Sequence, residues 1–207
     1  GIAAARSLDT DQFDVTLLDA NNYHLFQPLL YQVATGSLAA PDIATPLRMM
    51  LSPKSVRVVQ EKVSGIDVPG KFVLTVSGHT YCWEVLVLAI GLGHNYFGND
   101  RWSCHAPSLK FLEDAFEIRN RVLRALEEAE SCADVQLRER LLRFVVVGGG
   151  PTGVELAGAI GELTGRTLAR EFRSYDPRHA ETLLVEGGPR IIPQYSQSCS
   201  DSAVRQL

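Results

Sequence analysis

The chain has 207 residues, of which 45% are hydrophobic, and it carries a formal net charge of −4. This length and composition are typical of a globular protein that buries a sizeable core. Basic and acidic residues are mixed without a continuous basic run, which excludes nucleic acid as an expected partner. The longest unbroken apolar run, residues 85–90, is far shorter than the roughly 20 residues that cross a bilayer, so no transmembrane segment is expected.

The four cysteines are widely scattered, and none of them forms a Cys-x-x-Cys pair or has a histidine at the spacing of a zinc site. We therefore predict no metal site and interpret the cysteines as reduced thiols of a cytosolic chain. They are Cys82, Cys104, Cys132 and Cys199.

The chain opens directly on a helix of small residues, 1–6, followed by a β-branched and leucine-rich run, 13–19, that ends in Asp19. The run predicts a buried parallel strand. A helix and strand in this order imply a further strand in front of Gly1, and the end at Leu207 is equally abrupt. We therefore expect an internal fragment, truncated at both ends.

The middle of the first half changes character several times. Residues 21–36 are rich in aromatics and leucine without a clear period, which predicts a structured loop, and residues 41–51 lead into a short helix. Four strand-like runs then follow, separated by Pro-Gly and Ser-Gly turns, and they predict an antiparallel meander that returns to a central strand. The runs are 56–59, 62–66, 72–76 and 84–90.

The second half begins with a charged stretch, 109–143, whose apolar residues recur at helical spacing and predict one or two amphipathic helices. An apolar strand at 144–147, a glycine-rich turn, a helix over about 154–173 and a second strand at 182–186 then predict a βαβ unit.

The sharpest signal is the turn Gly-Gly-Gly-Pro-Thr-Gly at 148–153, which matches the pattern G-x-G-x-x-G between a strand and a helix. Gly148 permits the tight turn, Gly150 lets the backbone approach a pyrophosphate, and Gly153 allows close packing of helix on strand. The start of the helix offers amide hydrogens and the positive end of its dipole. The residues assigned here to dinucleotide binding are Gly148, Gly150, Pro151, Thr152 and Gly153.

Glu186, at the end of the next strand, is placed to accept hydrogen bonds from ribose hydroxyls and to repel a 2′-phosphate, which favours NADH over NADPH. The nearby Arg190 leaves NADPH open. The interval from Gly148 to Glu186 is longer than usual, which we assign to extra length around residues 165–179.

Two alternatives remain at this unit. A glycine-rich turn can simply pack a helix against a strand, although strand, helix and acid are all present here. Glu155 is an acid in the first turn of a helix, where the dipole alone stabilises it, or it acts at the nicotinamide as the candidate catalytic residue.

The beginning of the chain has the form of the back half of another such unit, with Gly1 as the last glycine of its fingerprint and Asp19 as its acid. Three segments then resemble type II NADH:quinone oxidoreductases, in that order and at about that spacing, and together they cover nearly the whole chain. They are Leu-Phe-Gln-Pro-Leu-Leu-Tyr-Gln-Val-Ala-Thr-Gly at 25–36, Leu-Val-Leu-Ala-Ile-Gly at 86–91 and Phe-Val-Val-Val-Gly-Gly-Gly-Pro-Thr-Gly-Val-Glu-Leu-Ala at 144–157.

The resemblance implies an α/β protein with two Rossmann-like dinucleotide-binding domains and an inserted antiparallel β-meander. The FAD-binding domain would be partial and span 1–107, with the meander at about 56–90, and the NADH-binding domain would span 108–207. The implied activity is transfer of electrons from NADH through FAD to a membrane quinone, ubiquinone or menaquinone, without proton pumping.

The resemblance also implies roles for single residues. Asp19 would hold the adenosine ribose of FAD, Val63 would meet the adenine by its backbone, and Ala89 and Gly91 would lie against the FAD. Glu155 would sit near the flavin and the nicotinamide. The family commonly has Thr where this chain has Ile90, which removes a hydroxyl.

The same resemblance implies a peripheral protein on the cytoplasmic side of the membrane, which it would contact through a later segment, and it leaves a homodimer open. Disulfide reductases share the architecture but carry a redox-active cysteine pair, and residues 21–36 contain no cysteine. The aromatics of that segment suit either an apolar slot beside a flavin or the core. A related reductase with a protein or other non-quinone acceptor, and an inactive NADH-binding fragment, remain alternatives.

Overall fold

The computed structural model describes residues 1–52 and 54–207, which form two compact units. The first unit contains residues Gly1–Leu25 and Ala44–Gly93, and the second contains Phe26–Ile43 and His94–Leu207. The chain therefore crosses between the units three times. Within the described residues no helix is both long and apolar enough to span a membrane.

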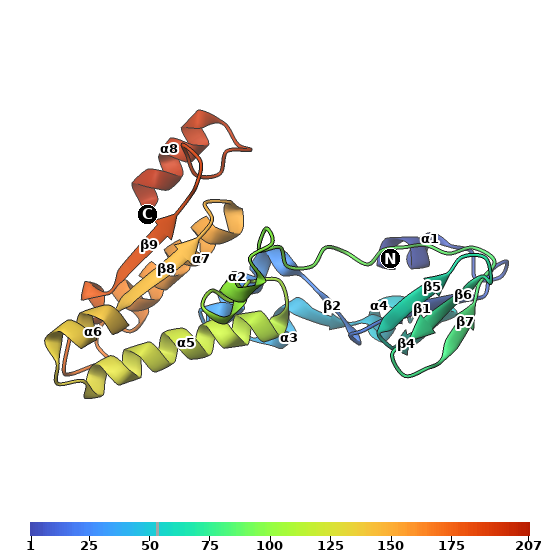
Figure 1. Ribbon diagram of the computed structural model, residues 1–207, viewed down its shortest axis with the longest axis horizontal. Helices are drawn as coiled ribbons and strands as arrows, with labels where there is room; N and C mark the ends of the chain where they lie inside the picture. The colour runs from blue at the N-terminus through green and yellow to red at the C-terminus, as the bar shows by residue number, and fades with distance from the viewer. Residues whose placement is uncertain (53) are drawn as a thin grey trace. The chain divides into compact units, whose positions relative to one another are not determined.

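The first unit contains two short helices, a two-stranded parallel sheet and a short antiparallel pair (Figure 1). In the parallel sheet β1 runs beside β4, in register from Val15 and Val56 to Asp19 and Gln60. Its strands are half-buried rather than fully buried as predicted: Thr16, Arg57 and Gln60 are exposed, and the other residues are of intermediate exposure. The elements are α1 (Ile2–Ser7), β1 (Val15–Asp19), β2 (Tyr23–Leu25), β3 (Ala44–Pro46), α4 (Leu47–Leu51) and β4 (Val56–Gln60).

The predicted meander is present in part, as the antiparallel sheet β5–β6–β7. The first of its predicted runs, 56–59, belongs instead to β4 and pairs in parallel with β1. Its strands are β5 (Val63–Asp67), β6 (Phe72–Thr75) and β7 (Thr80–Cys82). Its first turn is fixed by a hydrogen bond of 2.6 Å from the Gly70 amide to the Asp67 carboxylate, and its second turn places Gly78 at φ +88°. Glycine adopts that left-handed conformation without the steric cost of a side chain.

The prediction of a central strand at 84–90 was wrong. The structure gives this run no regular structure, and β7 ends before it. Val85 is 78% exposed and Ile90 is 87% exposed. A β-branched, apolar sequence favours extended backbone, but a strand also requires a neighbour to which its amides and carbonyls can bond, and this run has none among the described residues.

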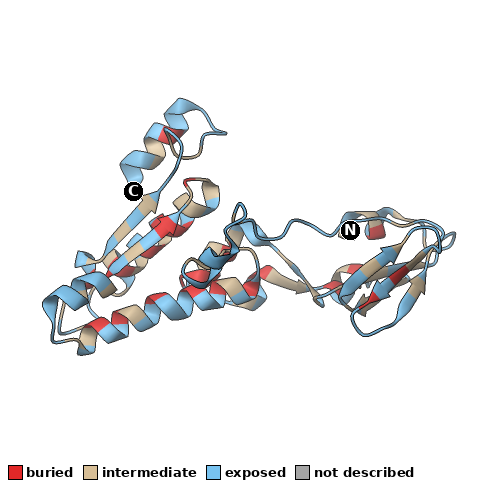
Figure 2. Ribbon diagram, in the orientation of Figure 1, coloured by how far each residue is buried: buried red, intermediate tan, exposed pale blue. Residues whose placement is uncertain are grey.

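The second unit is organised around a 20-residue helix, α5 (Leu112–Ser131), as the helical spacing predicted. Its buried residues recur every three or four positions and form the red stripe along the helix in Figure 2. They are Leu112, Ala115, Ile118, Val122, Leu126 and Ala129. The aromatic segment predicted as a loop contains instead the helical turns η1 (Gln27–Leu29) and α2 (Leu30–Ala34), and α2 packs on α5 and on α7 (Pro151–Glu162).

The predicted βαβ unit is present, with β8 (Arg143–Val147) and β9 (Glu181–Val185) paired in parallel and α7 between them. Asp134 caps α6 (Val135–Leu141), and Ser196 caps α8 (Gln197–Gln206), each with its side-chain oxygen on a backbone amide. Short helices in this unit therefore begin where the sequence supplies a cap. The segment Phe26–Ile43 also contains the short helix α3 (Ala40–Ile43).

The extra length between α7 and β9 is a structured segment. It begins with the π-helical turn η3 (Leu163–Thr167) and includes η4 (Pro177–His179). The Glu130 carboxylate accepts hydrogen bonds from the Arg173 and Ser174 amides at 3.0 and 2.9 Å, and the Tyr175 hydroxyl donates to the Leu126 carbonyl at 3.0 Å. These contacts attach the segment to α5 and explain the long interval between Gly148 and Glu186.

Candidate functional site

The glycine-rich turn at 148–153 lies between β8 and α7, and its conformation requires glycine at two positions. Gly148 has φ +105°, and its amide donates to the Val185 carbonyl at 2.7 Å. A Cβ atom at Gly153 would lie 1.9 Å from the Gly148 carbonyl oxygen, far inside contact distance. Helix and strand can meet this closely only because Gly153 has no side chain.

The start of α7 has the properties of a pyrophosphate site. Gly150 is its N-cap and Pro151 its first residue, and a Cβ atom at Gly150 would meet nothing within 4 Å. The first turn of an α-helix leaves its backbone amides without partners inside the helix, and those of Thr152 and Gly153 belong to this turn. An anion that enters the open space at Gly150 would meet amide hydrogens and the positive end of the dipole.

Glu186 follows β9 and lies directly against this turn. Its carboxylate accepts hydrogen bonds from the Gly149 amide at 2.6 Å and from the Gly188 amide at 2.7 Å. These two backbone donors, Gly188 first, lower the pKa of Glu186 below its ordinary value. The carboxylate is therefore ionised at neutral pH and retains lone pairs for further donors.

Arg190 is turned away from that carboxylate. Its guanidinium donates to the Pro193 carbonyl at 2.6 Å and reaches the Gln197 side-chain oxygen at 3.5 Å. No ion pair joins Arg190 to Glu186 anywhere in residues 1–52 and 54–207. Arg190, the residue that kept NADPH binding as an alternative, thus bonds Pro193 and Gln197 and does not neutralise the charge of Glu186.

A loop that the sequence did not single out braces the same turn. The Ile192 amide donates to the Gly149 carbonyl at 2.6 Å, so both polar backbone groups of Gly149 are bonded. Ile192 itself has φ +41°, a strained conformation for a β-branched residue. The Ser200 hydroxyl, in a residue that is 1% exposed, donates to the Ile191 carbonyl at 2.9 Å and anchors the loop from α8.

Glu155 lies one turn into α7, next to the predicted dinucleotide site. The residue is exposed, yet the surroundings of its carboxyl group partly exclude water, and this desolvation raises its pKa. A raised pKa keeps a proton on this carboxyl group to a higher pH than on an ordinary glutamate.

The first unit contains the residues predicted to contact FAD. A Cβ atom at Gly1 would lie 3.4 Å from that of Ala89, so these two residues are neighbours. The Asp19 carboxylate accepts from the Asn21 amide at 2.8 Å, and the Asp19 carbonyl accepts from the Glu61 amide at 2.8 Å. Gly91 has φ +68° and open space around it.

Val63 lies two residues beyond Glu61, whose amide bonds Asp19, and it begins the edge strand β5. The Val76 amide donates to the Lys62 carbonyl at 2.9 Å, which directs the polar groups of Lys62 toward β6. Adjacent residues of an antiparallel strand face opposite ways, so the amide and carbonyl of Val63 point outward from the edge. An adenine offers complementary donor and acceptor atoms on its edge.

Sequence reasoning missed a polar cluster around Glu61, in the same unit. Its carboxylate accepts from the Ser77 hydroxyl and His79 Nδ1, both at 2.6 Å, and from the Tyr81 hydroxyl at 3.2 Å. Hydrogen bonds, that of Ser77 first, lower the pKa of Glu61 from 4.5 to about 2. These residues come together with Glu61 only in the folded hairpin, so no local sequence pattern predicts the cluster.

The Glu61 cluster predicts an acid-dependent stability. Because the folded pKa lies below the unfolded one, the stabilisation is complete above about pH 4.5 and is lost as the pH falls toward 2. Acid unfolding of the wild type followed by circular dichroism should therefore show a pH dependence in this window that Glu61→Gln lacks. Parallel unfolding curves for the two proteins between pH 5 and 2 would contradict the assignment.

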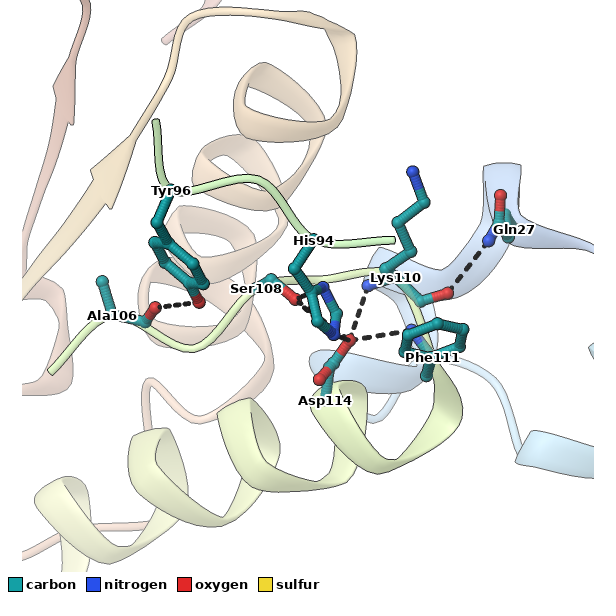
Figure 3. A network of polar contacts seen from close by, with 8 residues as sticks. All are labelled: Gln27, His94, Tyr96, Ala106, Ser108, Lys110, Phe111 and Asp114. Carbon is teal, nitrogen blue, oxygen red and sulfur yellow. Dashed lines mark hydrogen bonds and ion pairs between the residues drawn. The ribbon is translucent and has the colours of Figure 1, made fainter. Parts of the chain in front are cut away.

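A second polar network lies at the start of α5 in the second unit (Figure 3). The Asp114 carboxylate accepts from the Lys110 and Phe111 amides at 2.9 and 2.8 Å, and it accepts from the Ser108 hydroxyl at 3.2 Å. Ser108 also bonds His94, whose ring packs edge-on against Phe111. Asp114 thus caps the helix, and serine, histidine and aspartate serve the fold here without the linear order of a nucleophilic triad.

The aromatic segment is divided between core and surface. Leu30 is 1% exposed and belongs to the core, whereas Phe26 is 51% exposed. The Gln27 side-chain amide donates to the Lys110 carbonyl at 3.0 Å, which fixes this segment to the start of α5 (Figure 3). The core alternative therefore holds for Leu30, and the apolar slot beside a flavin stays a prediction for the exposed part of the segment.

The structure thus assembles two separate groups of predicted residues, each within one unit. Gly148, Gly150, Gly153 and Glu186 form one group, with Glu155 beside them. In the other unit Asp19 and Val63 are linked through Glu61, whose amide bonds Asp19, and Gly1 and Ala89 are neighbours.

Comparison with known proteins finds relatives that match the whole chain. The type II NADH:quinone oxidoreductases Ndh and NdhA of Mycobacterium tuberculosis are 41% and 43% identical over 211 residues, which is 100% of this chain and 46% and 45% of theirs. The chain thus spans about half the length of these curated relatives.

Solved structures show the same fold. NDH2 of Plasmodium falciparum in complex with NADH has a TM-score of 0.87 at 24% identity over 95% of this chain and 42% of its own. The sulfide:quinone oxidoreductase of Aquifex aeolicus has a TM-score of 0.69 at 22% identity, covering 100% of this chain and 46% of its own. The predicted α/β dinucleotide-binding fold is confirmed.

One family model covers the chain from end to end, residues 1–207, and its description is pyridine nucleotide-disulphide oxidoreductase. The chain therefore belongs to the pyridine nucleotide-disulphide oxidoreductase family.

Proposed function

We propose that the whole protein is a flavoprotein that passes electrons from NADH through FAD to a quinone. The observation that carries the NADH part is the contact between Glu186 and the glycine-rich turn. An ionised carboxylate lies beside the N-terminus of α7, in a turn whose conformation requires glycine at positions 148 and 153. This combination suits the ribose and the pyrophosphate of one dinucleotide.

In this proposal the amides at the start of α7 bind the pyrophosphate of NADH, and Glu186 accepts hydrogen bonds from the ribose hydroxyls. A 2′-phosphate would meet the charge of Glu186 while Arg190 remains bonded to Pro193. The site therefore favours NADH over NADPH.

The residues of the first unit fit FAD. The outward backbone of Val63 matches the edge of an adenine, and Asp19, at the end of β1, has a carboxylate that bonds only one described amide and can accept from a ribose. Gly1, Ala89 and Gly91 would line the rest of the FAD path in this unit. When bound, FAD supplies the redox chemistry, taking a hydride from NADH and returning electrons to the acceptor.

The choice of a quinone as acceptor rests on the relatives, which carry the name NADH:quinone oxidoreductase at 41–43% identity. The ring of Phe26 is 51% exposed and is an aromatic surface of the kind that a quinone ring would contact. Ubiquinone and menaquinone dissolve in membranes, so the whole protein would bind the membrane as a peripheral protein. By resemblance to the family, we place it on the cytoplasmic side of the membrane, as a monomer or a homodimer.

Glu155 is the proposed proton donor or orienting group. Quinone reduction consumes protons, and the raised pKa of Glu155 keeps its carboxyl group protonated at higher pH than usual. In the full-length protein, Glu155→Gln should lower NADH-to-quinone turnover about tenfold and remove the decline of the wild-type rate as the pH rises through that pKa.

The matched control is Glu162→Gln at the other end of α7, where the carboxylate is exposed and only 3.7 Å from Arg166. That variant should keep wild-type turnover. Unchanged turnover and an unchanged pH profile in Glu155→Gln would remove Glu155 from the mechanism.

Anaerobic mixing of the full-length protein with NADH tests the first half of the function. Flavin absorbance should bleach with NADH and respond far more weakly to NADPH at equal concentration. A protein that carries no flavin, or one whose flavin NADH leaves oxidised, would refute the proposal.

A further inference from the structure

Glu61 connects the two places in the first unit where the proposed FAD contacts lie. Its backbone amide donates to the carbonyl of Asp19 at 2.8 Å, at the end of β1. Its carboxylate accepts from Ser77 and His79 at 2.6 Å, in the turn that joins β6 to β7. One residue therefore ties the end of the parallel sheet to the tip of the meander.

Val63 lies two residues beyond Glu61, and its position depends on the same turn. The Val76 amide bonds the Lys62 carbonyl at 2.9 Å, next to the residues that bond Glu61. A turn that shifts relative to Glu61 would thus shift the strand edge at Val63 relative to Asp19. The distance between Val63, the proposed adenine contact, and Asp19, the proposed ribose contact, must match the distance between the two groups in one adenosine.

The turn has few other restraints. The Thr75 hydroxyl bonds Ser77 at 2.9 Å, the Thr75 amide donates to the His79 carbonyl at 3.0 Å, and Gly78 at φ +88° has open space around it. These contacts are internal to the turn and do not attach it to β1. The side chain of Glu61 is 15% exposed, so its hydrogen bonds are partly shielded from water.

We propose that Glu61 is a positioning residue for the adenosine end of FAD. It acts through Val63 and Asp19, holding the backbone of one at a fixed distance from the carboxylate of the other. This inference rests on the proposed function, because it takes the first unit to be the FAD-binding one. It adds a determinant of flavin retention that lies outside the residues in contact with the cofactor.

The test is the rate of FAD release from the full-length holoprotein, followed by the recovery of flavin fluorescence after dilution. Glu61→Gln keeps the size of the side chain but replaces one acceptor oxygen with a donor that faces Ser77 or His79. FAD should leave this variant about tenfold faster than the wild type. Tyr81→Phe, which removes only the 3.2 Å contact, should show a smaller increase.

Asp14→Asn is the matched control, since this acid is exposed and precedes β1 in the same unit. It should release FAD at the wild-type rate. NADH affinity should stay at the wild-type value in Glu61→Gln, because the NADH site lies in the other unit. The melting temperature of the FAD-free protein should fall at neutral pH, because the hydrogen bonds of the Glu61 carboxylate also stabilise the hairpin.

Equal FAD release from Glu61→Gln and Asp14→Asn would overturn the inference while the proposed function stands. Faster release together with an equal loss of NADH affinity would also overturn it, because the substitution would then disturb the fold as a whole and not the flavin site. A wild-type protein that does not bind FAD would overturn the proposed function itself.

Discussion

Gly153→Ala should weaken NADH binding about 100-fold, or about 2.8 kcal/mol. The added methyl group would lie 1.9 Å from the Gly148 carbonyl oxygen, a distance that only a shift of the backbone can relieve. Either α7 moves away from β8 or the turn opens, and both displace the amides that would bind the pyrophosphate. Titration of the full-length protein with NADH under anaerobic conditions measures the effect.

Gly161→Ala is the control for this variant. It lies in the same helix, and a Cβ atom there would meet nothing within 4 Å. This substitution should leave NADH affinity unchanged and stabilise the helix slightly, by about 1 kcal/mol at most. Equal NADH affinities for the Gly153 and Gly161 variants would show that the turn does not form the dinucleotide site.

Glu186→Gln should shift the preference between the two nicotinamide dinucleotides about 100-fold toward NADPH. NADH should bind about tenfold more weakly, because the ribose loses a charged acceptor and the Gly149 and Gly188 amides lose part of theirs. NADPH should bind about tenfold more tightly, because its 2′-phosphate no longer meets a negative charge. The ratio of the two dissociation constants is the quantity to measure.

Glu181→Gln provides the comparison for this effect. Glu181 begins the strand that Glu186 follows, and its exposed carboxylate lies 2.6 Å from the Arg143 guanidinium. Removing this surface pair should leave the ratio unchanged. If Glu186→Gln still prefers NADH by the wild-type factor, another group must distinguish the free ribose hydroxyl of NADH from the 2′-phosphate of NADPH.

The dinucleotide turn could be predicted because its requirements are local. The order strand, G-x-G-x-x-G and helix fixes which glycine faces the carbonyl and which faces the open space, and the structure has Gly153 and Gly150 in those places. Glu186 followed from the same logic, since the end of the next parallel strand lies beside the turn. The bonds of Arg190 to Pro193 and Gln197 could not be predicted from the sequence, because they depend on the conformation of a loop without a periodic pattern.

Other features depend on contacts that no sequence window contains. Residues 84–90 have the composition of a strand, but pairing decides whether a strand forms, and the structure leaves this run unpaired. The Glu61 cluster joins residues 16 to 20 positions apart through a hairpin. The segment Phe26–Ile43 packs with the second unit although both of its neighbours in sequence belong to the first.

The most direct test of the proposed function is steady-state turnover of NADH by the full-length protein with a soluble quinone analogue as acceptor. NADPH as donor, and a disulfide or a ferredoxin-type protein as acceptor, are run beside it. The proposed function predicts rapid quinone reduction with NADH and little with every other combination. A flavin that NADH reduces but quinone fails to reoxidise, while a protein or disulfide acceptor does, would contradict it.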